Sequence, residues 1–129
     1  DTPYANRIYA LMASVYFFEG KYDEAMAMFN SARLDLLGNE ERDDMTYRLA
    51  TCYLKTGNVK EAAIWFETLR STSKKYAADC TYYISYIRYT QQRYDEAMTG
   101  FLSLQDNAKY KALGTYYNAE IYLIKKNYE

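Results

Sequence analysis

Apolar residues recur along this chain every three or four positions, which is the spacing of one face of an α-helix. At the start of the first segment, Thr2 and Pro3 suit the N-cap and the first helical position. Gly20 is expected to end this helix, because glycine adopts the left-handed conformation past a helix end at little cost. The acidic pair at 23–24 then favours the start of a second helix, where the helix dipole stabilises negative charge. Apolar residues at helical spacing in the first helix are Ile8, Leu11, Met12, Val15 and Tyr16, and the predicted buried stripe of the second is Ala25, Met28, Phe29, Ala32 and Leu36.

The same pair of helices is predicted twice more, and its first helix a fourth time. A helix over about 39–56 ends at Gly57, and a helix over about 73–91 ends at Gln92-Arg93, a turn without glycine. A last helix is predicted to start at Asp106 and to end near residue 126. The apolar residues that mark these segments are Leu49, Ala50, Tyr53, Leu54, Ala62, Trp65, Phe66, Leu69, Ala97, Phe101, Leu104, Tyr116, Ala119, Tyr122 and Leu123.

A short polar stretch recurs between the paired helices, as GKYDEA, GNVKEA and QRYDEA, and the chain ends in KNYE. We interpret it as the tight corner of a helical hairpin, in which alanine lets the two helices approach closely. The aromatic residue four positions after each alanine is expected to fill the seam, the line of contact between the two helices of the hairpin. Self-similarity near 34 residues predicts a stacked helical array. The aligned positions Tyr22, Val59, Tyr94 and Tyr128 are separated by 37, 35 and 34 residues, and the aromatic positions are Phe29, Phe66 and Phe101.

Small and aromatic residues at these places resemble the signature of the tetratricopeptide repeat family. This resemblance implies an all-α fold, a right-handed superhelix of antiparallel helix pairs with about three and a half repeats and seven helices. We expect one domain over 1–129, with repeats at about 3–37, 40–72, 74–106 and a truncated 107–129, as part of a longer protein. The signature positions are Tyr9, Met12, Ala13, Tyr16, Gly20, Tyr22, Ala25, Phe29, Ala32, Leu49, Ala50, Tyr53, Gly57, Ala62, Phe66, Ile84, Ser85, Tyr94, Ala97, Phe101, Ala119, Tyr122 and Tyr128.

Composition narrows the classes of function. The net charge of −1 provides no basic excess to neutralise a phosphate backbone, so nucleic acid is not an expected partner. The chain has no histidine, which removes histidine-based catalysis and metal binding. The longest strongly apolar run, 10–18, is far shorter than the ~20 residues that span a bilayer. Cys52 and Cys80 are interpreted as buried free thiols, and a disulfide between them stays open as the alternative.

The tyrosines, 17 in all, suggest a binding surface. The resemblance implies a concave face lined by the first helix of each repeat, and Tyr47, Tyr82 and Tyr116 stand on it at spacings of 35 and 34. The carboxylate clamp of chaperone-binding members is not expected, since its lysine and asparagine positions are not filled. The tyrosines could instead pack the inner face without binding a ligand. The predicted partner-binding residues are Tyr47, Thr51, Leu54, Tyr82, Tyr86, Tyr89, Tyr116 and Glu120.

No catalytic, metal or cofactor constellation is recognisable in the sequence. The acidic stretch 39–44 lacks the pattern of a calcium loop, and Cys52 has no histidine to activate it. The main hypothesis is therefore a protein–protein interaction module, a scaffold or adaptor for a peptide or protein partner. The alternative is a structural spacer or self-association segment, with self-association through the unpaired C-terminal helix. Both cytoplasm and periplasm remain compatible with such an array.

Overall fold

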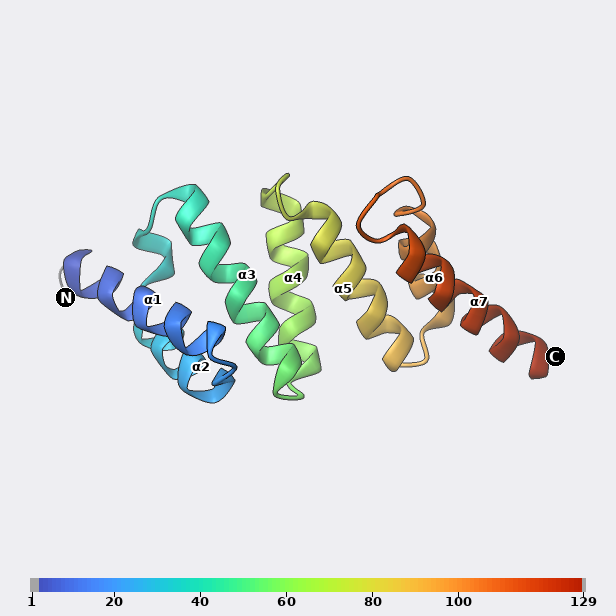
Figure 1. Cartoon of the computed structure of the whole chain (residues 1–129), viewed down its shortest axis with the longest axis horizontal. Coiled ribbons are helices and arrows are strands. Elements are labelled where there is room, and N and C mark those ends of the chain that lie inside the picture. The colour runs from blue at the N-terminus through green and yellow to red at the C-terminus, as the bar shows by residue number, and fades with distance from the viewer. Residues whose placement is uncertain (1–2, 129) are drawn as a thin grey trace. The chain divides into compact units, whose positions relative to one another are not determined.

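The computed structural model describes residues 3–128, and every regular element in that range is helical. The chain divides into two compact units, Asp1–Leu69 and Arg70–Glu129. Figure 1 shows the order of the helices along the chain. Their bounds are α1 (Pro3–Phe18), α2 (Tyr22–Ser31), η1 (a 3-10 helix, Leu34–Leu36), α3 (Asn39–Lys55), α4 (Val59–Thr72), α5 (Ala77–Thr90), α6 (Tyr94–Leu102) and α7 (Lys111–Asn127).

In the first unit, α1 and α2 form an antiparallel hairpin, and α3 packs against both helices (Figure 1). Alanines line the contact, which lets the helix backbones approach closely. The aromatic residue predicted for the seam, Phe29, is 1% exposed, and Phe66 and Phe101 are equally buried in their own pairs. Burial of these apolar side chains is the main stabilising term in a helical pair. The core of this unit consists of Ala10, Ala13, Ala25, Phe29, Leu37, Met45, Leu49 and Cys52.

The three corners predicted from the recurring stretch share one backbone geometry. Gly20 has φ +77° and Gly57 has φ +85°, in the left-handed region that glycine enters readily. At the first corner the N–H of Lys21 donates to the carbonyl of Tyr16 at 2.9 Å, the bond that closes a Schellman motif. The third corner makes the same turn with Gln92 at φ +62°. This residue lacks the freedom of glycine, so the corner carries local strain.

The predicted stripe of the second helix extends too far. The helix α2 ends at Ser31, and Leu36 lies in η1 with 59% of its surface exposed. The side chain of Asn6 explains the break, because its amide nitrogen donates to the carbonyl of Arg33 at 2.7 Å and its amide oxygen accepts the N–H of Arg33. These bonds hold the backbone of Arg33 outside the helix. Leu37, rather than Leu36, then enters the core.

The apolar residues that identified α1 do not form its buried face. This helix buries Asn6, Ala10, Ala13 and Ser14, and Tyr16 packs against the core, while the other four apolar residues of the predicted stripe point outward. Counting 37 residues on from Ile8, Met12 and Val15 gives Met45, Leu49 and Cys52 of α3, and these three are buried in the core of the unit. The exposed fractions in α1 are 39% for Ile8, 60% for Leu11, 42% for Met12 and 58% for Val15, against 6% for Met45, 2% for Leu49 and 0% for Cys52 in α3.

In the second unit, α6 packs against both α5 and α7, and glycines allow the close contacts. A Cβ at Gly100 would lie 1.8 Å from Ser85 Oγ, and one at Gly114 would lie 3.2 Å from the carbonyl oxygen of Phe101. The last helix begins at Lys111, so the predicted start at Asp106 is wrong. Asn107 shapes the turn before it, because its side-chain oxygen accepts the N–H groups of Lys109 and Tyr110 at 3.0 and 3.1 Å.

Candidate binding surface

Three predicted site residues, Tyr82, Tyr86 and Tyr89, lie on successive turns of α5. They pack, half-buried, around a small core made of Ala97, Phe101 and Ile121. Two further tyrosines, Tyr94 at the start of α6 and Tyr117 on α7, pack against the same core. The second unit therefore gathers one continuous group of aromatic rings, which we call the tyrosine cluster: Tyr82, Tyr86, Tyr89, Tyr94, Tyr110, Tyr116 and Tyr117.

One end of the tyrosine cluster is bonded within the unit. The rings of Tyr82 and Tyr110 stack with centroids 4.5 Å apart and planes 13° from parallel. The hydroxyl of Tyr110 donates to the carboxylate of Asp79, which also pairs with Lys109 Nζ at 2.9 Å. Burial raises the pKa of Tyr82 to about 12. The pKa of Tyr110 is also raised, by burial and by its bond to Asp79. The hydroxyls of Tyr82 and Tyr110 are therefore uncharged at physiological pH.

The other end of the cluster is more open. The ring centroid of Tyr89 lies 5.1 Å from that of Tyr117 and 6.0 Å from that of Tyr94. Tyr116, which follows on α7, is 57% exposed, and Glu120 lies one turn further along the same helix, half-buried. The pKa of Tyr89 is raised by desolvation and then by the negative charge of Glu120.

The remaining predicted residues, Tyr47, Thr51 and Leu54, lie on α3 in the first unit. The ring of Tyr47 meets Phe66 edge to face at a centroid distance of 6.1 Å. Thr51 is 8% exposed, and its hydroxyl donates to the carbonyl of Tyr47 at 2.9 Å. Leu54 is half-buried. The hydroxyl of Thr51 is thus used within its own helix, whereas the tyrosine ring and Leu54 retain exposed surface.

Sequence reasoning overlooked Tyr94, Tyr110 and Tyr117 as members of the aromatic cluster. Tyr94 is predicted as a hairpin-corner residue, and Tyr110 lies near the start of the predicted last helix, outside the predicted binding set. Tyr117 adjoins the predicted Tyr116, so its signal was present in the sequence. Its ring stacks on Phe101 with centroids 5.2 Å apart. The available clue was that Tyr117 directly follows the predicted binding residue Tyr116. Adjacent residues on a helix lie 100° apart, so both can border a wide groove.

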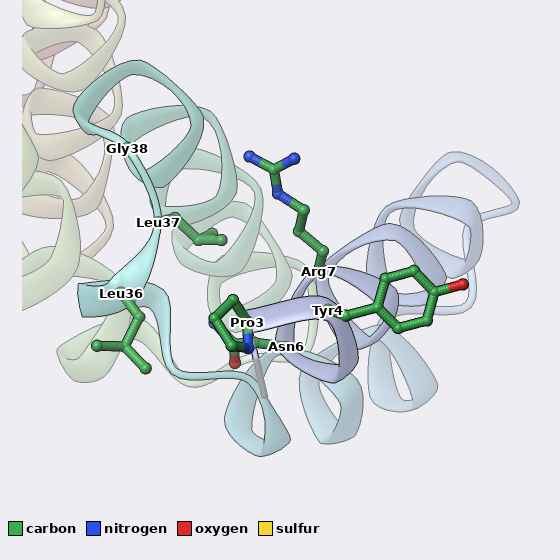
Figure 2. Close-up of a pocket in the computed structure, with 7 residues that line it drawn as sticks. All are labelled: Pro3, Tyr4, Asn6, Arg7, Leu36, Leu37 and Gly38. Carbon is green, nitrogen blue, oxygen red and sulfur yellow. The ribbon is translucent and has the colours of Figure 1, made fainter. Parts of the chain in front are cut away.

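Cavities occur elsewhere, at the start of α1 and at the start of α5. Figure 2 shows the first, about 300 Å³ in volume, between the first turn of α1 and residues 36–38. Its polar groups are engaged, since Asn6 bonds to Arg33 and Arg7 pairs with Glu41 at 3.5 Å. The second, about 430 Å³, lies between the start of α5 and residues 103–107. None of the predicted binding residues lines either cavity.

The structure gives no indication of reactive chemistry in the part of the chain that it describes. Cys52 and Cys80 are free and fully buried, as predicted. Burial raises the pKa of the Cys52 thiol to about 11 and that of Cys80 to about 12, so both are protonated and unreactive at neutral pH. Within residues 3–128 there is no group of three or more metal-ligating side chains, and no helix is long and apolar enough to cross a bilayer.

Comparison with known proteins identifies the repeat. The sequence profile described as tetratricopeptide repeat matches residues 17–78. Residues 17–78 of this chain are therefore identified as tetratricopeptide repeats. The fold class predicted from the sequence, an all-α tetratricopeptide-like superhelix, is therefore confirmed. Repeats of this family generally mediate protein–protein interactions and typically carry no catalytic activity.

A solved structure agrees with the assignment. It comes from Podosopora anserina, from a protein provisionally named a kinesin light chain and described as having nearly identical TPR-like repeats. It matches this chain with a TM-score of 0.66 at 17% identity, over 95% of this chain and 67% of that one. At such low identity the match concerns the fold alone. No curated protein is similar enough in sequence to count as a match.

Proposed function

We propose that this chain is a non-catalytic interaction module that binds a peptide or a partner protein on its tyrosine-rich face, as a scaffold or adaptor in a larger assembly. The observation that carries the proposal is the open end of the tyrosine cluster, with Tyr86 and Tyr89 on α5 and Tyr116 and Glu120 on α7. The other predicted residues are Tyr82 on α5 of the same unit and, in the first unit, Tyr47, Thr51 and Leu54 on α3. Tyrosine suits such a surface because it combines an apolar ring with a polar hydroxyl.

The hydroxyl groups support a peptide ligand in particular. Among the described residues, Tyr86, Tyr89 and Tyr116 have no hydrogen-bond partner for their hydroxyls. A bound peptide in extended conformation offers backbone N–H and carbonyl groups that these hydroxyls can bond. The half-buried rings would at the same time cover apolar side chains of the peptide. Affinity and orientation would thus come from the same residues.

Selection from a displayed library of random peptides on the purified chain tests this proposal. Fluorescence polarisation then measures each selected peptide against the wild type and Tyr116→Ser, which removes an exposed ring. We expect Tyr116→Ser to weaken binding about tenfold, or ~1.4 kcal/mol. The matched control is Tyr122→Ser on the same helix, where the ring is 62% exposed and lies outside the predicted set. Equal affinity for the wild type and folded Tyr116→Ser would contradict the proposal.

A structural spacer is the second candidate, and the bonded end of the cluster favours it. There Tyr82, Tyr110 and Asp79 are engaged with one another, as expected of side chains that only hold helices together. On this interpretation, Tyr82→Ala lowers stability and no selected peptide depends on Tyr116. The two candidates therefore differ in the binding experiment, whereas a stability measurement alone would not separate them.

Self-association is the further prediction attached to the second candidate. The last helix exposes Leu113, Tyr122 and Leu123, at 43%, 62% and 55% of their surface. Exposed apolar groups of this kind favour a second copy of the chain as the partner that covers them. Sedimentation velocity at several concentrations should show a dimer, and Leu123→Ser should shift the equilibrium towards monomer. A wild-type chain that stays monomeric at every concentration contradicts the prediction.

A further inference from the structure

Glu120 carries a negative charge that the described part of the molecule leaves without a cation. The residues one turn away on its own helix are Tyr116, Tyr117, Leu123 and Ile124, none of which is basic. Its carboxylate has no hydrogen bond or ion pair with any described residue, and the side chain is nevertheless half-buried. A half-buried carboxylate without a partner is unfavourable, so a ligand that neutralises it gains binding energy.

The other carboxylates on α5, α6 and α7 are paired, so Glu120 differs from every other carboxylate on these three helices. Asp79 pairs with Lys109 at 2.9 Å and also accepts the hydroxyl of Tyr110. On α6, Asp95 pairs with Lys125 of α7, and Glu96 pairs with Arg93 at 2.7 Å. The unit thus provides a cation for each of these helix carboxylates except the one at the open end of the tyrosine cluster.

Aromatic residues neighbour the unpaired carboxylate, with Tyr116 and Tyr117 one turn before Glu120 on α7 and with Tyr89 of α5 in ring contact with Tyr117. Tyr89, across from α7 on α5, lies close enough for the charge of Glu120 to raise its pKa. Its ring centroid is 5.1 Å from that of Tyr117, which in turn is 5.2 Å from that of Tyr116. The faces of aromatic rings carry partial negative charge, so they attract a cation within about 6 Å of the ring centre. Rings and carboxylate therefore favour the same kind of ligand.

We propose that Glu120, Tyr89, Tyr116 and Tyr117 form a subsite for a cationic side chain, arginine or lysine, in the bound partner segment. This inference rests on the proposed function and specifies the chemistry of the partner. The carboxylate forms a charge-assisted hydrogen bond with the cation, and the rings cover its apolar surroundings. Arginine fits best, because its planar guanidinium can lie on an aromatic ring while its edge donates two parallel bonds to a carboxylate.

The subsite can be tested by itself with N-acetyl-arginine amide as the probe and N-acetyl-citrulline amide as its uncharged analogue. NMR titration follows the ring signals of Tyr89, Tyr116 and Tyr117 in the wild type. We expect concentration-dependent shifts with the arginine compound and about fivefold weaker binding of the citrulline compound. Glu120→Gln should weaken arginine binding by about the same factor. Equal shifts with both compounds, or unchanged binding to Glu120→Gln, would overturn the inference.

The matched control is Asp106→Asn, which makes the same change of charge at an exposed position of the same unit, outside the tyrosine cluster. Asp106→Asn should bind the arginine compound as the wild type does. If it loses as much affinity as Glu120→Gln, the loss comes from the change in net charge and not from a subsite at Glu120. The peptide selection separates the two proposals. Selected peptides that need Tyr116 but lack arginine and lysine, and that bind Glu120→Gln unchanged, overturn the subsite while the proposed function stands. Arginine binding at Glu120 without any Tyr116-dependent peptide overturns the proposed function instead.

Discussion

The substitution Gly100→Ala tests how closely α5 and α6 are packed. The added Cβ would lie 1.8 Å from Ser85 Oγ and 3.0 Å from Ser85 Cβ, distances that no relaxed structure tolerates. Ser85 is 3% exposed, and its hydroxyl donates to the carbonyl of Thr81 at 2.7 Å. Either Ser85 rotates and gives up this bond, or the two helices separate. Both responses lower the free energy of unfolding.

The magnitude follows from three opposing effects. Alanine in a helix interior is more stable than glycine by about 1 kcal/mol. Overpacking of a tight contact costs about 1–3 kcal/mol, and the displaced hydrogen bond about 0.5–1.5 kcal/mol. The unfavourable effects are larger, so Gly100→Ala is expected to destabilise the chain by about 1–3 kcal/mol. Intrinsic helix propensity alone would predict the opposite sign, which makes the sign of the change informative.

Urea unfolding followed by circular dichroism measures the effect as a lower midpoint at an unchanged slope. Thr99→Ala on the exposed side of the same helix is the control, and it should be neutral or slightly stabilising. In combination with Ser85→Ala, the loss caused by Gly100→Ala should shrink by about 1–2 kcal/mol, because the clashing oxygen is gone. A Gly100→Ala chain as stable as the wild type, or additive effects of the two substitutions, would refute the packing argument.

Three further predictions concern backbone strain, a tertiary hydrogen bond and the thiols. Gln92→Gly should raise the free energy of unfolding by about 0.5–1 kcal/mol and Tm by roughly 2–5 °C in a thermal scan, since it relieves the left-handed conformation; an unchanged Tm would contradict strain at this corner. Asn6→Ala should cost about 1–3 kcal/mol in urea unfolding, because it removes both bonds to the backbone of Arg33, and a change below about 0.5 kcal/mol would show that water replaces them. Cys52 and Cys80 should react with a disulfide reagent at pH 8 about a hundredfold more slowly in the native chain than in guanidinium. Folding raises both thiol pKa values from 9.0, so the unfolded state loses protons first and stability should fall as pH rises above 9; rapid native labelling, or stability independent of alkaline pH, would contradict this burial.

Most of the repeat could be predicted because its determinants are local. The corners at Gly20 and Gly57 depend on residues a few positions apart, and the Schellman bonds found there connect groups five apart in sequence. The corner at Gln92 was also predicted. It followed from its position in the repeat of about 34 residues, since no glycine marks it. Seam residues such as Phe29 followed from helical spacing and the alanine four positions earlier. The predicted binding residues lie on the helices expected for them, and their role in binding is still a prediction.

Most of the wrong predictions concern features of the structure that residues distant in the sequence determine. Periodicity marked α1 as a helix, but Leu11 and Val15 face outward because the neighbouring helices cover its small residues instead. The end of α2 depends on Asn6, which lies 27 positions from Arg33 and carries no sign of that contact in the sequence. The third error is local: the last helix is predicted to start at Asp106, whereas the side chain of Asn107 shapes a turn and α7 begins at Lys111.

The sequence by itself determined the helices, their corners, their period and hence the family, because each arises from interactions between residues within one repeat. The tertiary structure alone decided which face of α1 is buried, which tyrosines hold the unit together and which remain open. It also showed that Asp79 has a cation and that Glu120 has none among the described residues. These differences depend on contacts between helices some 30 residues apart in the chain, where packing and charge pairing act through space and leave no regular trace in the order of residues.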